Sequence, residues 1–258
     1  MVDAIKKWLA HPGTRDLAID DPRTTERRRG IIQSNRFLWR IYDEWYRSIA
    51  ARIPDGPGSV LELGSGAGFL AKYVPGLIAS EVFLCPDLNV VLDARQLPFA
   101  SGSLKAIVMV DVFHHIPDSR AFLQEAQRCL RPGGSMVMIE PWVSTWSRLI
   151  YTYLHHEPFI PEAKDWIVPS TGPLSGANGA LPWIVFQRNH AKFESEFREL
   201  EIQAVEPFMP FRYLVSGGVS MRPLMPEATL PLWSRLESWL GAWPERWAMF
   251  ALVHVTRR

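Results

Sequence analysis

A glycine-rich loop is the part of this sequence that points most directly to chemistry. The loop is Glu62-Leu-Gly64-Ser65-Gly66-Ala-Gly68, and it follows a short apolar run. Glycines allow a tight turn and let a ligand approach the backbone, and the N–H groups that open a following helix can bind an anionic or polar group. The spacing is G-x-G-x-G, without the G-x-G-x-x-G of dinucleotide-binding folds or the lysine of a phosphate-binding loop. The loop therefore predicts a cofactor site of another kind.

Two pairs of adjacent histidines could take part in proton transfer. They are His114-His115 and His155-His156, and Glu157 follows the second pair. Imidazole and carboxylate groups act as general bases or as metal ligands. Adjacent histidines point in different directions on most backbones and no third ligand stands at metal-binding spacing, so we expect no metal site. We consider His115, His156 and Glu157 candidate bases, with a structural polar cluster as the equal alternative and a packing role for at least one of His114 and His115.

Alternating strands and helices are predicted to position these residues. Apolar runs predict strands at residues 59–63, 77–83, 90–93, 104–111 and 135–140. Helices are predicted at residues 31–53, 67–74 and 119–130. This alternation is typical of βαβ units and a mostly parallel sheet. Residues 1–30 are predicted to be loosely ordered, and the arginine run at 27–29 to be a solvated face before a helix.

The chain changes character after Pro141. Strands are predicted at 199–205 and 248–255, whereas the segments 142–192 and 207–247 have no clear period apart from a helix near 232–240. All 11 tryptophans lie outside residues 46–141. Aromatic side chains in such segments can line an apolar pocket or meet a lipid surface. For most of them we favour a simpler role in filling the core of a small lid.

Composition excludes several classes of protein. The 258 residues include 28 basic and 27 acidic side chains, so no strong field draws the chain to nucleic acid or to an anionic membrane. The two cysteines form no motif and are expected to be reduced thiols, which suits a cytoplasmic protein. No stretch approaches the ~20 apolar residues of a membrane span, and the first residues contain no apolar run of the length expected in a signal peptide. We expect a soluble protein with peripheral membrane contact at most.

The glycine loop resembles motif I of class I S-adenosylmethionine-dependent methyltransferases, and three later segments resemble that family in order. Asp93-Ala-Arg-Gln-Leu-Pro-Phe99 resembles the segment after the third strand, Asp111-Val-Phe-His-His-Ile-Pro117 the fourth-strand motif, and Leu130-Arg-Pro-Gly-Gly134 the turn before the fifth strand. The likeness covers about residues 58–141 and is closest to the "type 11" small-molecule branch. It implies an α/β fold with a Rossmann-like, seven-stranded, mostly parallel sheet of order 3-2-1-4-5-7-6, whose last two strands are 199–205 and 248–255.

The resemblance also implies roles for individual residues. It implies that S-adenosyl-L-methionine is bound by Glu62, Gly64, Ser65, Gly66, Gly68, Glu81, Asp93, Ala94, Asp111 and His114. Glu81 corresponds to the acidic residue that holds the ribose hydroxyls, since a carboxylate about 20 residues beyond the loop has this role in related folds. Only six residues, 84–89, join the second and third predicted strands, so Asp87 is a rival for the ribose.

Together these features predict one methyltransferase domain over residues 1–258. Its cofactor-binding core is 58–141, and its acceptor side is covered by an N-terminal cap region at 1–57 and by the inserts 142–192 and 207–247. We expect methyl transfer to a small-molecule or lipid-like acceptor, first at oxygen, with carbon and nitrogen open. The Asn/Asp-Pro-Pro-Tyr motif that marks nucleobase methylation in this superfamily is absent, which argues against nucleic acid. The alternative is a non-catalytic S-adenosylmethionine-binding or scaffold protein of the same fold, and the loop pattern disfavours an NAD-dependent oxidoreductase.

Overall fold

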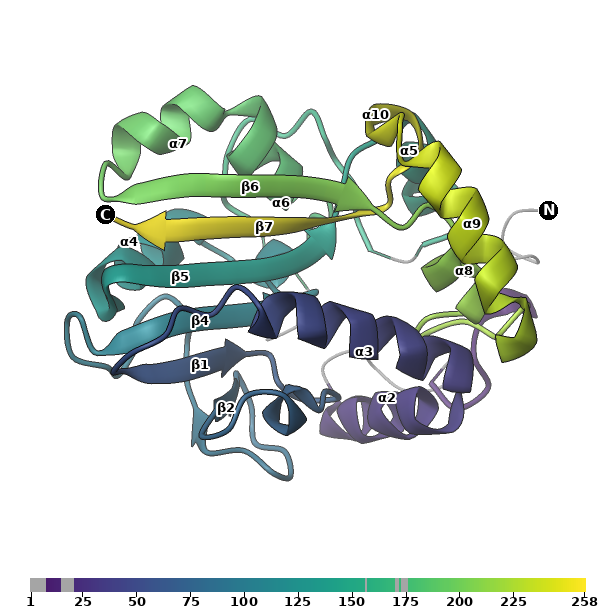
Figure 1. Cartoon of the computed structure of the whole chain (residues 1–258), viewed down its shortest axis with the longest axis horizontal. Coiled ribbons are helices and arrows are strands. Elements are labelled where there is room, and N and C mark those ends of the chain that lie inside the picture. The colour runs from purple at the N-terminus through teal and green to yellow at the C-terminus, as the bar shows by residue number, and fades with distance from the viewer. Residues whose placement is uncertain (1–7, 15–20, 156, 170–171, 173–175) are drawn as a thin grey trace.

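The computed structural model describes residues 8–14, 21–155, 157–169, 172 and 176–258. Within this part of the chain, one seven-stranded sheet has the order β3-β2-β1-β4-β5-β7-β6 (Figure 1). The strands are β1 (Ser59–Leu63), β2 (Ile78–Glu81), β3 (Val90–Val91), β4 (Leu104–Val110), β5 (Leu130–Pro141), β6 (Leu200–Phe208) and β7 (Phe250–Arg257). Strand β7 pairs antiparallel with β5 and β6, and the pairings among β1 to β5 are parallel. The predicted α/β class and strand order are confirmed.

Helices cover both faces of the sheet. One face carries α4 (Ser119–Cys129), α6 (Leu181–Trp183), the π-helix η3 (Ile184–Arg188) and α7 (His190–Glu196); the other carries α2 (Pro22–Ser34), α3 (Arg36–Ala50) and α5 (Thr145–Tyr153). Strand β5 shows how the sequence divides between the two layers. Met136 and Met138 pack into the first layer and Val137 and Ile139 into the second, as the two-residue period of a strand requires. A strand buried on both faces accordingly has a continuous apolar sequence.

The remaining helices lie at the end of the molecule toward which the parallel strands point (Figure 1). They are α8 (Arg212–Ser216), α9 (Leu230–Leu240) and α10 (Pro244–Trp247). Two short helical turns, η2 (Phe113–His115) and η4 (Glu227–Thr229), follow β4 and precede α9. No helix among the described residues combines the length and the hydropathy needed to cross a membrane.

The N-terminal helix differs from its prediction. Instead of one helix over 31–53, α2 begins at Pro22 and ends at Ser34, and α3 follows after Asn35. The Asn35 side chain accepts a hydrogen bond from the Leu38 N–H at 3.1 Å, which caps α3 and interrupts the helical path. The expectation of loose order up to residue 30 is therefore wrong from Pro22 onward, and the arginine run lies inside α2.

The helix predicted at 67–74 is also wrong. This segment holds one 3₁₀ turn, η1 (Leu70–Lys72). Phe69 has a φ of −145°, outside the helical region, and its ring stacks on Trp39 of α3 with centroids 3.8 Å apart. Pro75 and Gly76 then end the segment. The aromatic contact with α3 and this early stop together leave room for a single turn.

Candidate functional site

The glycine loop after β1 has no room for side chains. Gly64 has a φ of +66°, and a Cβ there would collide with Val112. A Cβ on Gly66 would lie 2.6 Å from Oε1 of Glu81 and 2.6 Å from Cγ2 of Thr25. The Gly66 N–H donates a hydrogen bond to Oε1 of Glu81 at 3.1 Å, which ties the loop to the end of β2. The bare backbone therefore forms one wall of a cavity.

That cavity, which we call the first cavity, lies at the carboxyl edge of the parallel strands and measures about 170 Å³. In open α/β sheets this edge is where ligands bind. The ends of β1, β2 and β4, the segment after β3, and helices α2 and α3 all contribute to its wall. Lining residues with polar side chains include Thr25, Arg28, Tyr42, Tyr46, Glu62, Ser80, Glu81, Asp93, Asp111 and His115.

Three carboxyl groups of this cavity have perturbed acidities. Burial raises the pKa of Glu62 to about 7, although a hydrogen bond from Ser65 opposes the rise. Burial also raises the pKa of Glu81. The pKa of Asp111 is raised to about 6, mainly by burial, and Asp111 has a positive φ of 61°. Buried acids with raised pKa values cluster at functional sites, and a bound cation would restore their charged forms.

Glu81 and Asp87, the two candidates for the ribose, lie in different surroundings. Glu81 lines the first cavity and is nearly buried. Asp87 is exposed, does not line the cavity, and forms an ion pair with Arg29. The same Arg29 donates a hydrogen bond to the Gly66 carbonyl at 2.8 Å, so it braces the loop from outside. Of the two carboxylates, only Glu81 has access to the first cavity.

A second cavity of about 70 Å³ adjoins the first. The two cavities share Arg28, Asp111, His115 and Val219 in their walls. The second is otherwise lined largely by apolar and aromatic side chains from α5, α8 and the start of β7, together with the polar residues Tyr151, His155, Glu157, Tyr213 and Ser220. A molecule in the second cavity would contact a ligand of the first cavity beside Asp111 and His115. We call this place the junction of the two cavities.

Behind this junction lies a buried imidazole–carboxylate cluster. Nδ1 of His114 is 2.7 Å from Oε2 of Glu140, whose Oε1 accepts the N–H groups of Val112 and Phe113 at 2.8 and 2.7 Å. Nε2 of His114 faces Oε2 of Glu157 at 3.4 Å. Burial lowers the pKa of His114, but the two carboxylates outweigh burial and hold it well above its ordinary value. His114 is therefore an imidazolium that links Glu140 to Glu157.

His115 differs from His114 in its protonation state. Burial, helped by the neighbouring His114 cation, lowers the pKa of His115 to about 4, so the ring is neutral near pH 7. Its Nδ1 lies 3.0 Å from the carbonyl oxygen of Gly176, which fixes the proton on Nδ1 because a carbonyl can only accept. Its Nε2 lone pair then faces the junction, 3.7 Å from Oε1 of Glu157.

The same cluster contains two groups of possible metal ligands. Ligand atoms of His114, His115 and Glu157 lie within 4.8 Å of one another, as do those of Asp111, His114 and Glu140. The sequence argument missed these groups because it looked for ligands near one another in the chain. A protonated His114 offsets one of the negative charges of this cluster, and the expectation of no metal site stays a prediction.

The structure brings most of the predicted site residues to the two cavities. Glu62, Gly64, Gly68, Glu81, Asp93, Ala94 and Asp111 line the first, His115 lines both, and Glu157 lines the second. Ser65 and His114 are buried behind the wall. Gly66 contacts the wall through the hydrogen bond from its N–H to Glu81. His156 lies outside the described residues.

Sequence reasoning missed two functional candidates. Arg28 lines both cavities, and its Nε is buried without a hydrogen-bond partner in the described structure, so the prediction of a solvated arginine face is wrong here. Glu140, at the end of β5, anchors His114. Glu140 could have been found from the sequence, because it is a carboxylate at the end of a buried strand. Arg28 could not, because the segment before residue 31 was not predicted to be helical.

Comparison with known proteins agrees with this geometry. A family described as "Methyltransferase domain" matches residues 61–138. A demethylmenaquinone methyltransferase of Beutenbergia cavernae is 31% identical over 117 residues, which cover 38% of this chain and 49% of that protein. A fatty-acid O-methyltransferase of Mycolicibacterium smegmatis is 31% identical over 115 residues, which cover 38% of this chain and 42% of the relative. The chain thus spans about half the length of the curated relatives it matches.

A solved structure extends the likeness to the fold as a whole. It is the geranyl diphosphate C-methyltransferase of Streptomyces coelicolor in complex with Mg²⁺, geranyl diphosphate and S-adenosyl-L-homocysteine, with a TM-score of 0.53 and 14% identity over 97% of this chain and 91% of that chain. At this identity the match speaks for the fold alone. Fold, glycine loop and family match coincide over the same strands. Residues 61–138 are thus similar to a methyltransferase domain, and the sheet around them has the fold of that solved methyltransferase.

Proposed function

We propose that this protein transfers a methyl group from S-adenosylmethionine to a small-molecule or lipid-like acceptor, and that the acceptor atom is oxygen. The observation that carries the proposal is the junction of the two cavities. One is walled by the glycine loop and three acidic strand ends, the other largely by apolar side chains, and they meet at Asp111 and His115. A methyl donor in the first and an acceptor in the second would be held next to each other.

The residues of the first cavity suit S-adenosylmethionine. Gly64 and Gly68 line this cavity without side chains, so a ligand can approach their backbone closely. Glu81 can accept hydrogen bonds from ribose hydroxyls. A cationic group near the buried Glu62 would lower its raised pKa and favour the ionised carboxylate. Arg28 has an unpartnered buried Nε that can donate to a carboxylate. When bound, the cofactor supplies a methyl group that is already activated by its sulfonium.

The protein's own part is to position the acceptor and to take its proton. The neutral His115 offers its Nε2 lone pair at the junction. Glu157, at 3.7 Å, would stabilise the imidazolium that forms, and His114 holds Glu157 in place. A hydroxyl becomes strongly acidic as its oxygen gains a methyl group, so a base with a low pKa suffices late in the reaction.

Oxygen is the favoured acceptor atom because a hydroxyl must lose a proton, and this junction holds a group that can receive it. The largely apolar wall of the second cavity favours an acceptor with a hydrocarbon body. Two relatives, named for a quinone and for fatty acids, modify molecules of that type. We also propose that 1–57, 142–192 and 207–247 act together as the cap that excludes water from the junction.

The test is S-adenosylhomocysteine production with a panel of hydroxyl, carboxyl, amine and activated-carbon acceptors carrying hydrocarbon chains. We expect turnover with hydroxyl or carboxyl compounds. His115→Asn and Glu157→Gln should each lower turnover on the order of 10²- to 10⁴-fold while leaving cofactor affinity unchanged. The matched control is His190→Asn, a half-exposed imidazole on α7 that faces Glu194.

Two results would count against this assignment. Methylation confined to amine or carbon acceptors would overturn oxygen as the acceptor atom. Tight cofactor binding without turnover on any member of the panel would favour the alternative, a non-catalytic S-adenosylmethionine-binding protein.

A further inference from the structure

Helix α9 carries an apolar stripe on its outer side. Leu232, Leu236, Trp239 and Trp243 are 67%, 36%, 64% and 39% exposed. The spacing of four and three residues places Leu232, Leu236 and Trp239 within about 60° of one another around α9, and Trp243 follows three residues after the helix ends. The rings of Trp239 and Trp243 pack edge to face with centroids 5.6 Å apart. These four side chains, which we call the outer stripe, thus form one continuous surface.

The orientation of this stripe is fixed by the adjoining, inward side of α9. Leu240 and Glu237 are buried there, and Trp233 packs against the ring of Phe211. Glu237 accepts the N–H groups of Phe211 and Arg212 and forms an ion pair with the Arg212 guanidinium. Rotation of α9 to bury the stripe would expose Leu240 and break the ion pair between Glu237 and Arg212. The apolar arc of α9 is therefore wider than the part of it that packs against the protein.

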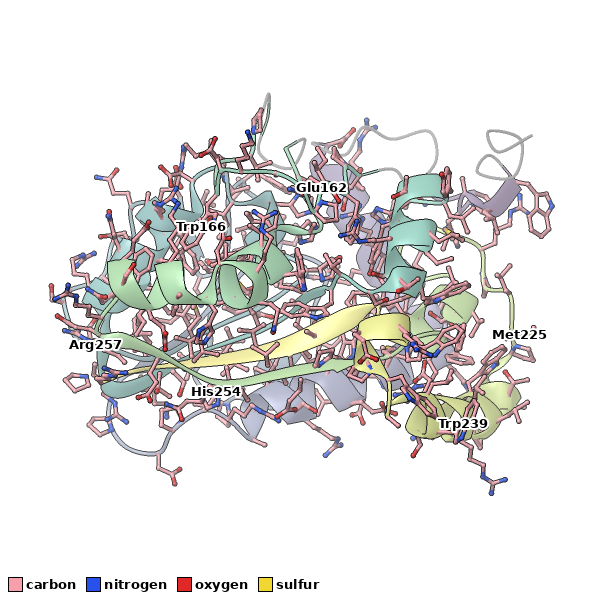
Figure 2. The ribbon with its side chains drawn as sticks, turned by 90° about the horizontal axis from the view of Figure 1, so that it is seen from above. Glu162, Trp166, Met225, Trp239, His254 and Arg257 are labelled. Atoms are coloured by element: carbon pink, nitrogen blue, oxygen red, sulfur yellow. The ribbon has the colours of Figure 1, made fainter. Side chains whose placement is uncertain are left out.

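A second pair of exposed apolar side chains lies in the segment between α8 and η4, which also reaches the second cavity. Met225 and Trp239 lie at the same end of the molecule (Figure 2), and Met225 and its neighbour Leu224 are 39% and 41% exposed. The same segment begins with Gly217, and its residues up to Met221 line the second cavity. A few residues of chain therefore connect the cavity wall to the exposed surface.

Arginines lie close to these apolar side chains, and Arg36 lines a groove together with Leu224 and Met225. Arg36, Arg222, Arg235 and Arg246 are exposed, and in the described structure none of them forms an ion pair. Arg235 lies within α9, at the edge of the outer stripe. Among the acidic neighbours, Glu227 is paired with Arg40, and Glu245 is exposed beside Arg246 in α10. Tryptophan and leucine on one side of a helix, edged by arginine, are typical of helices that lie in the headgroup region of a membrane.

We propose that α9 docks onto the surface of an anionic lipid bilayer, with the outer stripe inserted among the acyl chains and the arginines on the headgroups. A second copy of the chain is the less suitable partner. The stripe with Leu224 and Met225 amounts to six side chains, against the roughly 20–30 residues per side of a stable protein interface. The arginines close to it would also repel those of a second copy.

The test is co-sedimentation with vesicles of equal parts phosphatidylcholine and phosphatidylglycerol, compared with phosphatidylcholine alone, in the absence of cofactor and acceptor. The wild-type protein should bind the anionic vesicles more tightly. The double substitution Leu232→Gln with Trp239→Gln should weaken binding by more than about tenfold. Arg235→Gln should weaken binding to anionic vesicles by about fivefold and leave binding to neutral vesicles unchanged.

The matched control is Ile167→Gln. Ile167 is 58% exposed, and its neighbour Trp166 lies far from Trp239 (Figure 2). This variant should bind vesicles like the wild type. The proposal is overturned if the wild-type protein does not sediment with anionic vesicles, or if the double variant binds as the wild type does. It is equally overturned if sedimentation velocity shows a wild-type dimer that the double variant converts to monomer. Because cofactor and acceptor are absent, none of these results depends on the proposed methyl transfer.

Discussion

Glu140 and His114 are joined by a hydrogen bond of 2.7 Å between Oε2 and Nδ1, and neither side chain has any exposed surface. Glu140 is at the end of β5 and His114 is in the turn after β4, so the bond fastens two neighbouring strand ends at the cavity edge. Because Glu140 also accepts two backbone N–H groups, the turn that presents His115 depends on this one carboxylate.

Glu140→Gln should destabilise the protein by about 2–4 kcal/mol, because it leaves the buried His114 cation with a weaker partner. The pKa of His114 in the folded protein is held above its ordinary value of 6.5. Its stabilising contribution is thus fully present below pH 6.5 and is lost as the pH rises through the folded pKa. Urea unfolding over this range should show a decline for the wild type and a flatter profile for Glu140→Gln. Equal unfolding free energies would refute the ion pair.

Gly66→Val should abolish S-adenosylhomocysteine binding, because its side chain would enter the space between Glu81 and Thr25. Calorimetry and circular dichroism together would separate lost binding from lost folding. Gly30→Ala is the matched control, since a Cβ at Gly30 meets no atom within 4 Å. A folded Gly66→Val protein with wild-type affinity would show that the loop does not contact the cofactor.

Glu81→Ala should weaken cofactor binding by about 1.5–3 kcal/mol, the contribution of a charge-assisted hydrogen bond. Asp87→Ala should have little effect, because Asp87 lies outside the first cavity and pairs with Arg29. Calorimetric titration of both variants decides between the two carboxylates. The assignment is wrong if Asp87→Ala alone loses affinity.

Cofactor affinity should rise as the pH increases through about 7, the pKa of Glu62 in the free protein. A positively charged cofactor binds better to the ionised carboxylate, so binding is weaker where Glu62 is protonated and stronger where it is charged. The slope should disappear in Glu62→Gln, which titrates nothing at this position. A slope that persists in Glu62→Gln would assign the dependence to another group, with Asp111 the first to examine.

The strands and the glycine loop could be predicted because their signals are local. Apolar runs such as 104–110 have few alternatives, and the loop residues are adjacent in the chain. The acceptor side could not be predicted in this way, because its residues come from distant segments. Arg28, Glu140 and Tyr151 reach the same region from α2, β5 and α5. Phe69 shows the same limit, since a ring contact with Trp39 outweighs the local tendency of 67–74 to form a helix.

Arg212 has a consequence for how the acceptor cavity can open. Its guanidinium pairs with Glu237 of α9 and with Glu44 of α3, so one side chain joins three helices that are far apart in the sequence. Separating them would leave a largely buried positive charge without partners, which is costly. We therefore expect α3, α8 and α9 to move as one rigid body. An acceptor would then enter by displacement of a different wall. The segment from Gly217 to Met221 lines the second cavity and is held by backbone contacts with Ala10 and His11 rather than by this ion pair, so we expect it to be the part of the wall that moves.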